Sequence, residues 1–501
     1  MSADFTRRLQ SSPYSMRTLT GYMALAAFVC VCFADIEIIS PDPLLELKAM
    51  SEGLLNPRID NVKEVLFSVA NTLSFALQGM GLAVFFGFLL ALFYQLWWVR
   101  AFCAFIRAIH ELFFALIFIQ VFGLSPLSGL LAIGLPYAGT LAKVYGELFE
   151  EVQTDPRNNL LHKKGFSAFL YTTFFQSWPT LVHYTRYRFE CALRSTVVLG
   201  FVGLPTLGFH LESTLKQGQY AESAGLIYIL LLLIASQKLW LRKQLLPVLL
   251  FVSVLYLPPT ANVSWSTVSH FFGTDIIPLP FRDGLVSAPS LFEYSHTLWH
   301  EELKPGVINT VILSQVALFL SAFLALLLFP LTSARFFNGA FNKLVRGGGK
   351  TLLLVGRTLP EYLLAFIALL LWGPSMLPAF VALALHNGTI LAHLLAQISG
   401  TFVLREDATQ GVNRYFYEVL PRIYRQFLAL LFYRWEIIMR ESAILGILGV
   451  TTLGFYIDSA FEAFRFDRAV LLILASAFLN MGVDALARFL RRNLHVQTAV
   501  D

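Results

Sequence analysis

YRFECALRSTVVLGFVGLPTLGF at residues 187–209 and YRWEIIMRESAILGILGVTTLGF at residues 433–455 are two copies of one stretch. At a constant offset of 246 residues, 11 of 23 positions are identical. Each copy runs from a basic segment into an apolar segment with three glycines, which we call the glycine ladder: Gly200, Gly203 and Gly208 in the first copy, and Gly446, Gly449 and Gly454 in the second. Because glycines allow close helix packing and local breaks in membranes, the pattern predicts a bent, membrane-embedded segment that occurs twice.

The composition is that of a membrane protein. Of the 501 residues, 56% are hydrophobic and 14% are charged, whereas soluble domains carry about 25% charged residues. The apolar runs are long enough for spanning helices, which need about 20 apolar residues, and they lack the alternation of barrel strands. The four cysteines have no metal-ligand spacing and are predicted to be small buried side chains. The predicted fold class is an all-α polytopic membrane protein.

The apolar runs predict about twelve transmembrane helices. They lie near residues 19–39, 65–98, 102–123, 127–147, 175–207, 221–241, 245–258, 307–330, 351–373, 377–399, 424–453 and 468–490. The run at 245–258 is shortened by two prolines. The runs longer than 25 residues are predicted to contain a bend or a re-entrant part.

The net charge of +5 follows from membrane topology, and it predicts no nucleic-acid partner. If the amino terminus is inside, the predicted inner segments carry 23 Lys and Arg residues and the outer segments carry 8. Cytoplasmic loops hold the excess of positive residues, so both termini are predicted to be cytoplasmic. The first apolar run lacks a small-residue cleavage site and is therefore interpreted as a retained span.

Further matches extend the repeat over most of the chain. Asn71-Thr72 corresponds to Asn309-Thr310, and the pair Arg107 and Glu111 corresponds to Arg357 and Glu361. The predicted halves are residues 1–243 and 244–501. An even number of spans in each half gives two parallel repeats of the same orientation.

The second copy continues as RESAILGILGVTTLGFYIDSAFEAFRFDRA over residues 440–469, with a glycine ladder followed by an acidic and aromatic segment. With the preceding basic segment, this pattern resembles the last third of phosphonate-import permeases. The first copy shares the pattern less closely. In that family one chain usually supplies one half of the membrane part, so the resemblance implies two permease halves fused in one chain, with a fold like that of type I ABC importers.

The resemblance implies a function and partners. The chain would be the transmembrane subunit of an ATP-driven ABC importer in the bacterial inner membrane, and it would translocate phosphonate or a related oxyanion such as phosphite or phosphate. A homodimeric ATP-binding subunit on the cytoplasmic side would hold ATP and Mg²⁺. A periplasmic or lipid-anchored solute-binding protein would deliver the substrate. The chain itself would be no enzyme and would bind no cofactor.

Two other classes of function stay open. A secondary transporter with twelve spans would need no ATPase, and a membrane scaffold would transport nothing. The sequence Arg346-Gly347-Gly348-Gly349-Lys350-Thr351 resembles the end of a phosphate-binding loop. However, Leu344 stands where that motif requires its first glycine, and no buried strand precedes it. The chain is therefore not predicted to hydrolyse ATP.

Two cytoplasmic loops are predicted to couple the chain to the ATPase. The resemblance places there a short docking helix with an EAAxxxG-like sequence, and the glycine occurs in both halves, as Gly165 and Gly411. The rest of the motif is degenerate. In the second half it comprises Glu406, Asp407 and Ala408, with Glu406 one residue out of register.

Charged residues at membrane depth are costly and therefore informative. Glu190 and Arg194, like Glu436 and Arg440, are four residues apart, so each pair can neutralise itself on one helix face. The arginines either line the translocation path, where their planar donors suit an oxyanion, or brace helices near the cytoplasmic side.

The glycines of the ladder also allow two interpretations, close helix packing or a gate that opens at the break. The predicted path or gate residues among them are Gly200, Gly203, Gly446 and Gly449. The histidines are expected to have no role in metal binding. His110, His183, His386 and His393 are scattered in the sequence, with no HxxxH pair and no carboxylate set. No metal site is predicted.

Overall fold

The computed structural model describes residues 16–152, 165–242, 244–257, 263–282, 287–333, 336, 340–405 and 412–493. Within these ranges the chain is helical and contains no strand. It divides into two compact units. The first unit is Leu47–Ile277, and the second unit combines the described parts of Met1–Glu46 and Pro278–Asp501.

The elements of the first unit follow the chain from α3, which begins just before it. They are α3 (Pro43–Leu55), α4 (Val62–Leu92), α5 (Trp97–Ala108), α6 (Glu111–Phe122), α7 (Pro126–Glu151), α9 (Phe166–Ala168), the π-helical turn η1 (Phe169–Phe174), α10 (Phe175–Gly200), α11 (Leu207–Lys216), α12 (Tyr220–Ala235), α13 (Gln237–Trp240), α14 (Leu246–Tyr256), α15 (Trp265–His270) and η2 (Phe271–Asp275). The longest helix, α4, packs along α7, and α10 packs against both.

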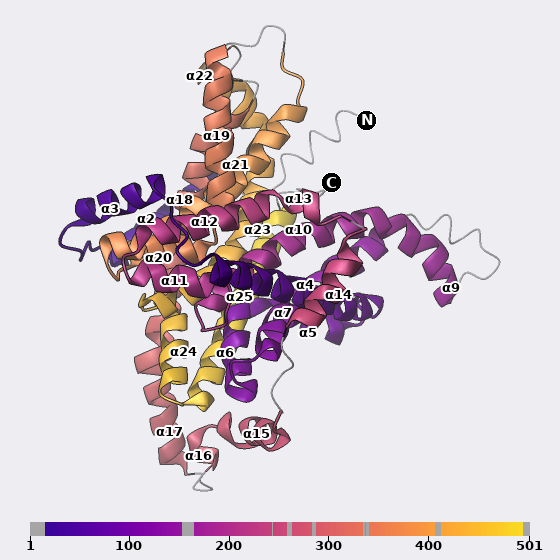
Figure 1. The fold of residues 1–501 in the computed structure, drawn as a ribbon, viewed down its shortest axis with the longest axis vertical. Coiled ribbons are helices and arrows are strands. Elements are labelled where there is room, and N and C mark those ends of the chain that lie inside the picture. The colour runs from indigo at the N-terminus through magenta and orange to yellow at the C-terminus, as the bar shows by residue number, and fades with distance from the viewer. Residues whose placement is uncertain are drawn as a thin grey trace. The chain divides into compact units, whose positions relative to one another are not determined.

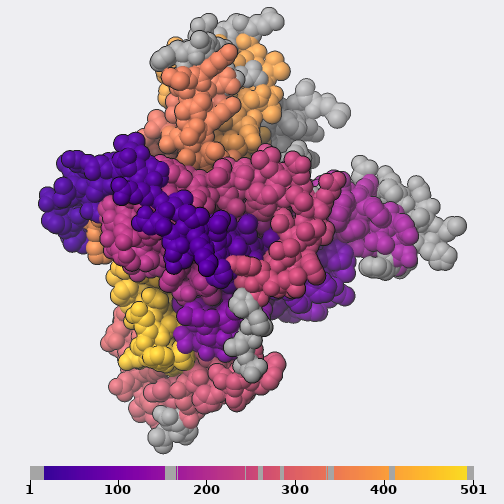
Figure 2. All heavy atoms as spheres, viewed as in Figure 1, coloured from indigo at the N-terminus to yellow at the C-terminus, as the bar shows by residue number. Residues whose placement is uncertain are grey.

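The second unit repeats this order of elements. They are α2 (Met16–Phe33), α16 (Leu279–Arg282), α17 (Ala288–Thr297), η3 (Leu298–Leu303), α18 (Lys304–Thr332), α19 (Ala340–Thr358), α20 (Glu361–Trp372), α21 (Met376–Thr401), α22 (Val412–Arg414), η4 (Tyr415–Val419), α23 (Leu420–Ile444), the 3-10 turn η5 (Leu445–Leu448), α24 (Leu453–Glu462) and α25 (Phe466–Asn493). Helix α18 packs along α21, as α4 does along α7. Figure 1 shows α19 beside α21, and in Figure 2 their atoms form one continuous column.

Apolar side chains cover much of the surface of single helices. On α2, Phe28 is 68% exposed, and on α14 Phe251 and Leu255 are 65% and 70% exposed. A soluble protein rarely exposes contiguous apolar surface of this kind, whereas lipid accommodates it. The chain is therefore a multi-pass membrane protein, as predicted.

The number of spans is smaller than the predicted twelve by the criteria of length and composition. Among the described residues, six helices are long and apolar enough to cross a membrane, or up to nine if each bent pair is one span. Two shorter apolar helices, α12 and α14, remain outside this count. The twelve-helix count is not confirmed, because the predicted spans at α10, α12 and α14 are not among these candidates. Helix α14 has 11 residues, and a helix of that length rises only about 17 Å.

The compact units have different boundaries from the predicted sequence halves. Helix α2 begins the chain but packs on α18 in the second unit, where Thr20 Oγ1 and Tyr424 Oη lie 2.6 Å apart. Helix α14 lies in the predicted second half but packs on α4 in the first unit, where Gln78 Nε2 donates to the Ser253 carbonyl at 2.6 Å. Each of these two helices thus packs in the unit that holds most of the other predicted half.

Candidate functional site

Each glycine ladder folds into a tight helix–turn–helix unit, which we call the hairpin, in which the end of a long helix meets the start of a short one at backbone distance. A Cβ atom on Gly208 would lie closer than 3.0 Å to the carbonyl of Val197, and a Cβ atom on Gly454 would lie equally close to the carbonyl of Ala443. Real Cβ atoms essentially never approach so closely, so only glycine fits either position. The packing interpretation of the ladder is supported in both units.

The opposite side of each hairpin is built in the same way. A Cβ atom on Gly200 would collide with the backbone of Phe209, and one on Gly446 with the backbone of Phe455. These glycines lie at the end of α10 and within η5, immediately before the turns that lead into α11 and α24. Both helices of the hairpin therefore approach each other through glycine.

The turn of each hairpin requires the third glycine. Gly203 has φ +92° and Gly449 has φ +88°, a left-handed conformation that residues with a Cβ rarely adopt. In the second unit the hairpin is a broken span, bent by 44° between Val412–Leu448 and Leu453–Glu462. The predicted bend is therefore present, and it lies at the predicted glycines.

An Asn-Thr pair from the neighbouring long helix fixes each turn. In the first unit, Asn71 Nδ2 donates to the Pro205 carbonyl at 2.8 Å, and Thr72 Oγ1 accepts from the backbone N–H of Leu207 at 2.9 Å. The sequence comparison matched these residues without giving them a role. They satisfy backbone groups that the break in the helix leaves without helical partners.

The second unit repeats this pair with nearly the same geometry. Asn309 Nδ2 donates to the Thr451 carbonyl at 2.8 Å, and Thr310 Oγ1 accepts from Leu453 N–H at 3.0 Å. Thr72 and Thr310 are buried. We call each Asn-Thr pair a hairpin lock. The two locks have the most closely repeated polar geometry in the described residues.

A second repeated feature lies at two sharp bends. Helices α5 and α6 meet at 88°. Helix α19, over its residues Lys343–Thr358, meets α20 at 97°. Glu111 and Glu361 are the first residues of α6 and α20, where the positive end of the helix dipole favours a carboxylate. Arg107 and Arg357 lie on the helix before each bend, whereas Glu111 and Glu361 lie on the helix after it.

In the first unit the glutamate joins a chain of hydroxyl groups. Ser195 Oγ donates to Glu111 Oε1 at 2.6 Å, and Tyr137 Oη lies 3.0 Å from Ser195 Oγ. His110 lies beside the same carboxylate, with its Nε2 atom 3.6 Å from Glu111 Oε2. The cluster contains one carboxylate.

The second unit carries different side chains at the corresponding place. Glu441 stands at the repeat position of Ser195, and its Oε2 atom accepts from Asn387 Nδ2 at 2.9 Å. His386 Nε2 lies 3.7 Å from Glu361 Oε2. His386 therefore lies in a group with two carboxylates, which its sequence spacing did not indicate, whereas His110 lies beside one carboxylate.

The predicted path residues are half-buried on α10 and α23. Glu190 Oε2 accepts from Gln237 Nε2 at 2.7 Å, a partner that sequence analysis did not suggest. Arg194 donates to Cys191 Sγ at 3.3 Å on the preceding turn of α10. Glu436 and Arg440 occupy the same repeat positions on α23.

The coupling loops are only partly described. Gly165 is exposed, has φ +127° and has open space where a Cβ would lie. It stands directly before α9, which continues into η1. The corresponding α22 starts at Val412 and continues into η4. The other predicted coupling residues, Glu406, Asp407, Ala408 and Gly411, lie outside the described residues.

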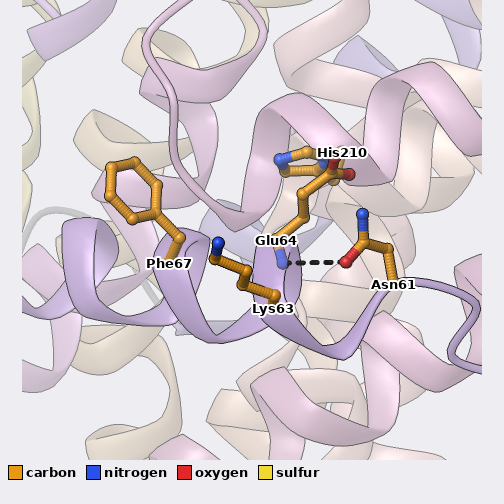
Figure 3. A pocket seen from close by; sticks show the side chains of 5 residues that line it. All are labelled: Asn61, Lys63, Glu64, Phe67 and His210. Atoms are coloured by element: carbon orange, nitrogen blue, oxygen red, sulfur yellow. Dashed lines mark hydrogen bonds between the residues drawn. The ribbon is translucent and has the colours of Figure 1, made fainter.

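A shallow pocket of about 290 Å³ opens at the start of α4 in the first unit. Figure 3 shows Asn61, whose Oδ1 atom accepts from Glu64 N–H at 3.3 Å, with the His210 side chain near Glu64. Lys63 and Phe67 complete the lining. Its side chains carry both signs of charge, so the pocket is not specialised for an anion.

These features define a multi-pass helical membrane protein with an internal duplication and a glycine-broken hairpin in each unit. Comparison with known proteins then identifies its relatives. The chain is 25% identical over 491 residues to the phosphate-import permease protein PhnE of Mycolicibacterium smegmatis, a match that covers 89% of this chain and 88% of the relative. The predicted resemblance to permeases is confirmed over nearly the full length of the chain, as expected for a fused permease.

Shorter relatives match parts of the chain. The phosphite transport system permease protein PtxC of Stutzerimonas stutzeri is 29% identical over 131 residues, which cover 26% of this chain and 48% of the relative. A protein of Escherichia coli K12 named for a cryptic phosphonate transport system is 26% identical over 108 residues, which cover 21% of this chain and 88% of the relative. No family model matches the chain, and no solved structure matches it. The chain is thus a transport permease by similarity along its length.

Proposed function

We propose that the chain is the fused transmembrane subunit of an ATP-driven ABC importer, and that it moves a small phosphorus oxyanion, namely phosphate, phosphite or phosphonate, across the bacterial inner membrane. The observation that carries this proposal is the full-length similarity to a phosphate-import permease. The partial relatives are named for phosphite and phosphonate transport, so the shared chemistry is an oxyanion of phosphorus.

The hairpins would form the part that opens and closes. Each has a glycine turn that can change its backbone conformation, and each is tied to a long helix by the few hydrogen bonds of its lock. An element held by few, defined contacts can adopt a second arrangement without disruption of the helices around it. The substrate path would therefore run past both ladders.

The ATPase would dock on the two cytoplasmic loops at 151–166 and 401–415. Support comes from the shared glycine and from the matched α9–η1 and α22–η4 segments that begin directly after Gly165 and Gly411. Cysteines placed at Ser167 and Val412, both exposed, should cross-link to the ATP-binding subunit in an active transporter. A functional complex without a cross-link at either position would contradict this docking.

The arginines test whether the path takes an anion. If Arg440 meets the oxyanion, Arg440→Gln should reduce uptake at least 10-fold while the complex still assembles. If Arg440 is a brace, Arg440→Gln and Glu436→Gln should each lower the yield of assembled complex, and the double variant should restore it. Arg194→Gln with Glu190→Gln provides the matched set in the first unit, where Glu190 already has Gln237 as a partner.

Uptake into proteoliposomes tests the whole proposal. The chain, its ATP-binding subunit and its solute-binding protein are reconstituted with radiolabelled phosphate, and unlabelled phosphite, phosphonate and sulfate serve as competitors. We expect that uptake requires ATP on the side of the membrane where the ATP-binding subunits lie. We also expect that unlabelled phosphorus oxyanions inhibit this uptake more strongly than sulfate does. Uptake driven by an ion gradient without ATP hydrolysis would overturn the importer assignment in favour of a secondary transporter.

A further inference from the structure

Three helices of the second unit bring an imidazole and two carboxylates together. Glu361 begins α20, His386 lies within α21 and Glu441 lies within α23. Their ligand atoms all lie within 4.8 Å of one another. His386 is 3% exposed and Glu441 is 7% exposed, so the group is shielded from solvent.

The surroundings fix which nitrogen of His386 faces the carboxylates. Nδ1 lies 3.2 Å from the carbonyl oxygen of Gly356 and 3.0 Å from that of Leu359. Carbonyl oxygens only accept, so Nδ1 carries the hydrogen. In the neutral ring Nε2 then presents a lone pair toward Glu361, the arrangement that metal-binding histidines have when a backbone carbonyl holds their other nitrogen.

Glu441 is also oriented from outside the group. Asn387 Nδ2 donates to its Oε2 atom at 2.9 Å, while Asn387 Oδ1 accepts from Arg434 at 3.4 Å. Asn387 therefore links Arg434 to Glu441 by two hydrogen bonds. The Glu441 carboxylate also lies close to Glu361 and His386. Such support of a ligating carboxylate by a second hydrogen-bonded group is typical of metal sites.

The first unit shows what the second unit has gained. At the repeat positions of His386 and Glu441 it carries Pro136 and Ser195. Its histidine, His110, has the other orientation: Nδ1 accepts from Leu112 N–H at 3.2 Å, so Nε2 carries the hydrogen and donates toward Glu111. A proton already occupies the place where a metal ion would bind.

We propose that Glu361, His386 and Glu441 bind one divalent transition-metal ion, such as Zn²⁺, which ties α20, α21 and α23 together. One imidazole and two carboxylates are ligands that suit Zn²⁺. Ligands around a tetrahedral Zn²⁺ ion lie roughly 3.3 Å apart, so the two glutamate side chains close in on the ion by rotation. With three protein ligands the ion keeps a fourth position for water. The site holds helices together, is independent of the substrate, and goes beyond the proposed transport function.

The test counts metal on the purified full-length chain, prepared with a tag that contains no histidine. After incubation with Zn²⁺ and dialysis, elemental analysis should find one Zn²⁺ per chain, and Co²⁺ should give the visible absorption of a tetrahedral complex that Zn²⁺ abolishes. Glu441→Ser, which installs the residue of the first unit, should lose the bound ion. Glu111→Gln, at the corresponding bend of the first unit, is the matched control and should keep it.

Thermal unfolding provides a second readout. EDTA should lower the unfolding midpoint of the wild type by several degrees and leave that of Glu441→Ser unchanged, with both proteins similar in EDTA. His386→Gln should behave like Glu441→Ser. The proposal is overturned if the wild type holds no Zn²⁺, if the variants hold as much as the wild type, or if infrared spectra show a protonated Glu441 carboxyl that added Zn²⁺ does not displace.

Discussion

The two glycine ladders and the two bend clusters have diverged to very different degrees. In the ladders, Gly208 and Gly454 meet a backbone carbonyl at the same repeat position, and the hairpin locks have nearly equal hydrogen-bond lengths. At the bend of the first unit, hydroxyl groups surround Glu111. At the bend of the second unit, a second carboxylate, Glu441, takes the place of the serine hydroxyl. Contacts in which one partner is the backbone have been kept in both units. Contacts between two side chains have been exchanged.

The strongest way to break this comparison is to add a single methyl group to the ladder. Gly454→Ala forces a Cβ atom against the Ala443 carbonyl, which we expect to cost more than about 4 kcal/mol and to abolish uptake. Gly208→Ala should be as severe, because the contact is the same. The yield and the unfolding midpoint of each variant measure the effect.

Gly482→Ala is the matched control for the ladder variants. Gly482 lies in α25 with open space around it, so alanine should be neutral or should stabilise the helix by up to about 1 kcal/mol. An unaltered Gly454→Ala protein would show that the hairpin is not packed at backbone distance.

The hairpin locks should give an intermediate effect. Thr310→Val keeps the shape of the side chain but removes the acceptor for Leu453 N–H, which should cost about 1–3 kcal/mol because the donor stays buried. Thr310→Ser restores the hydroxyl and should recover most of the loss. Chemical denaturation of the purified chain measures both.

Thr72→Val sharpens the comparison of the locks, since it removes the same bond in the first unit. We expect equal losses of stability from Thr72→Val and Thr310→Val, and additive losses in the double variant, since the two sites share no partner. Equal stability but unequal uptake would show that the two hairpins work differently.

Much of the architecture could be predicted from the sequence, and the reason is its periodicity. The glycines at equal offset predicted both hairpins, and the long apolar runs predicted α4, α7, α18 and α21 to within a few residues. The sharp bend after Arg107 and Arg357 was not predicted, because each apolar run was interpreted as one span that includes the polar residues at 107–111 and 357–361. Only His110 and Pro360, which stand at the two helix starts, signal the break.

The polar clusters were harder to predict than the hairpins. Glu361, His386 and Glu441 come from three helices and are far apart in the chain, so no local motif shows that they meet. Sequence spacing favoured pairs four residues apart, such as Glu190 and Arg194, whereas the structure gives Glu190 a glutamine from a different helix. Only Asn71-Thr72 and its repeat, which recur at matched positions, contained a usable signal.

The smallest expected effect comes from a difference within the repeated hairpins. Phe464 has φ +55°, a left-handed conformation, at the repeat position where Gly218 has φ +72°. A left-handed residue with a Cβ costs about 1–2 kcal/mol, so Phe464→Gly should raise stability by about 1 kcal/mol. Gly218→Ala is the reciprocal change and should lower stability by a similar amount. A lower unfolding midpoint for Phe464→Gly would mean that its ring contributes more packing than its backbone costs.

The exchange of outer helices has a consequence for any attempt to divide this protein into two genes. A cut between residues 243 and 244 would leave α2 on one polypeptide and its packing partner α18 on the other, and it would likewise separate α14 from α4. Neither fragment could complete a compact unit from its own residues. Two such polypeptides would have to be synthesised together and trade helices during insertion, so neither half could be replaced or duplicated alone.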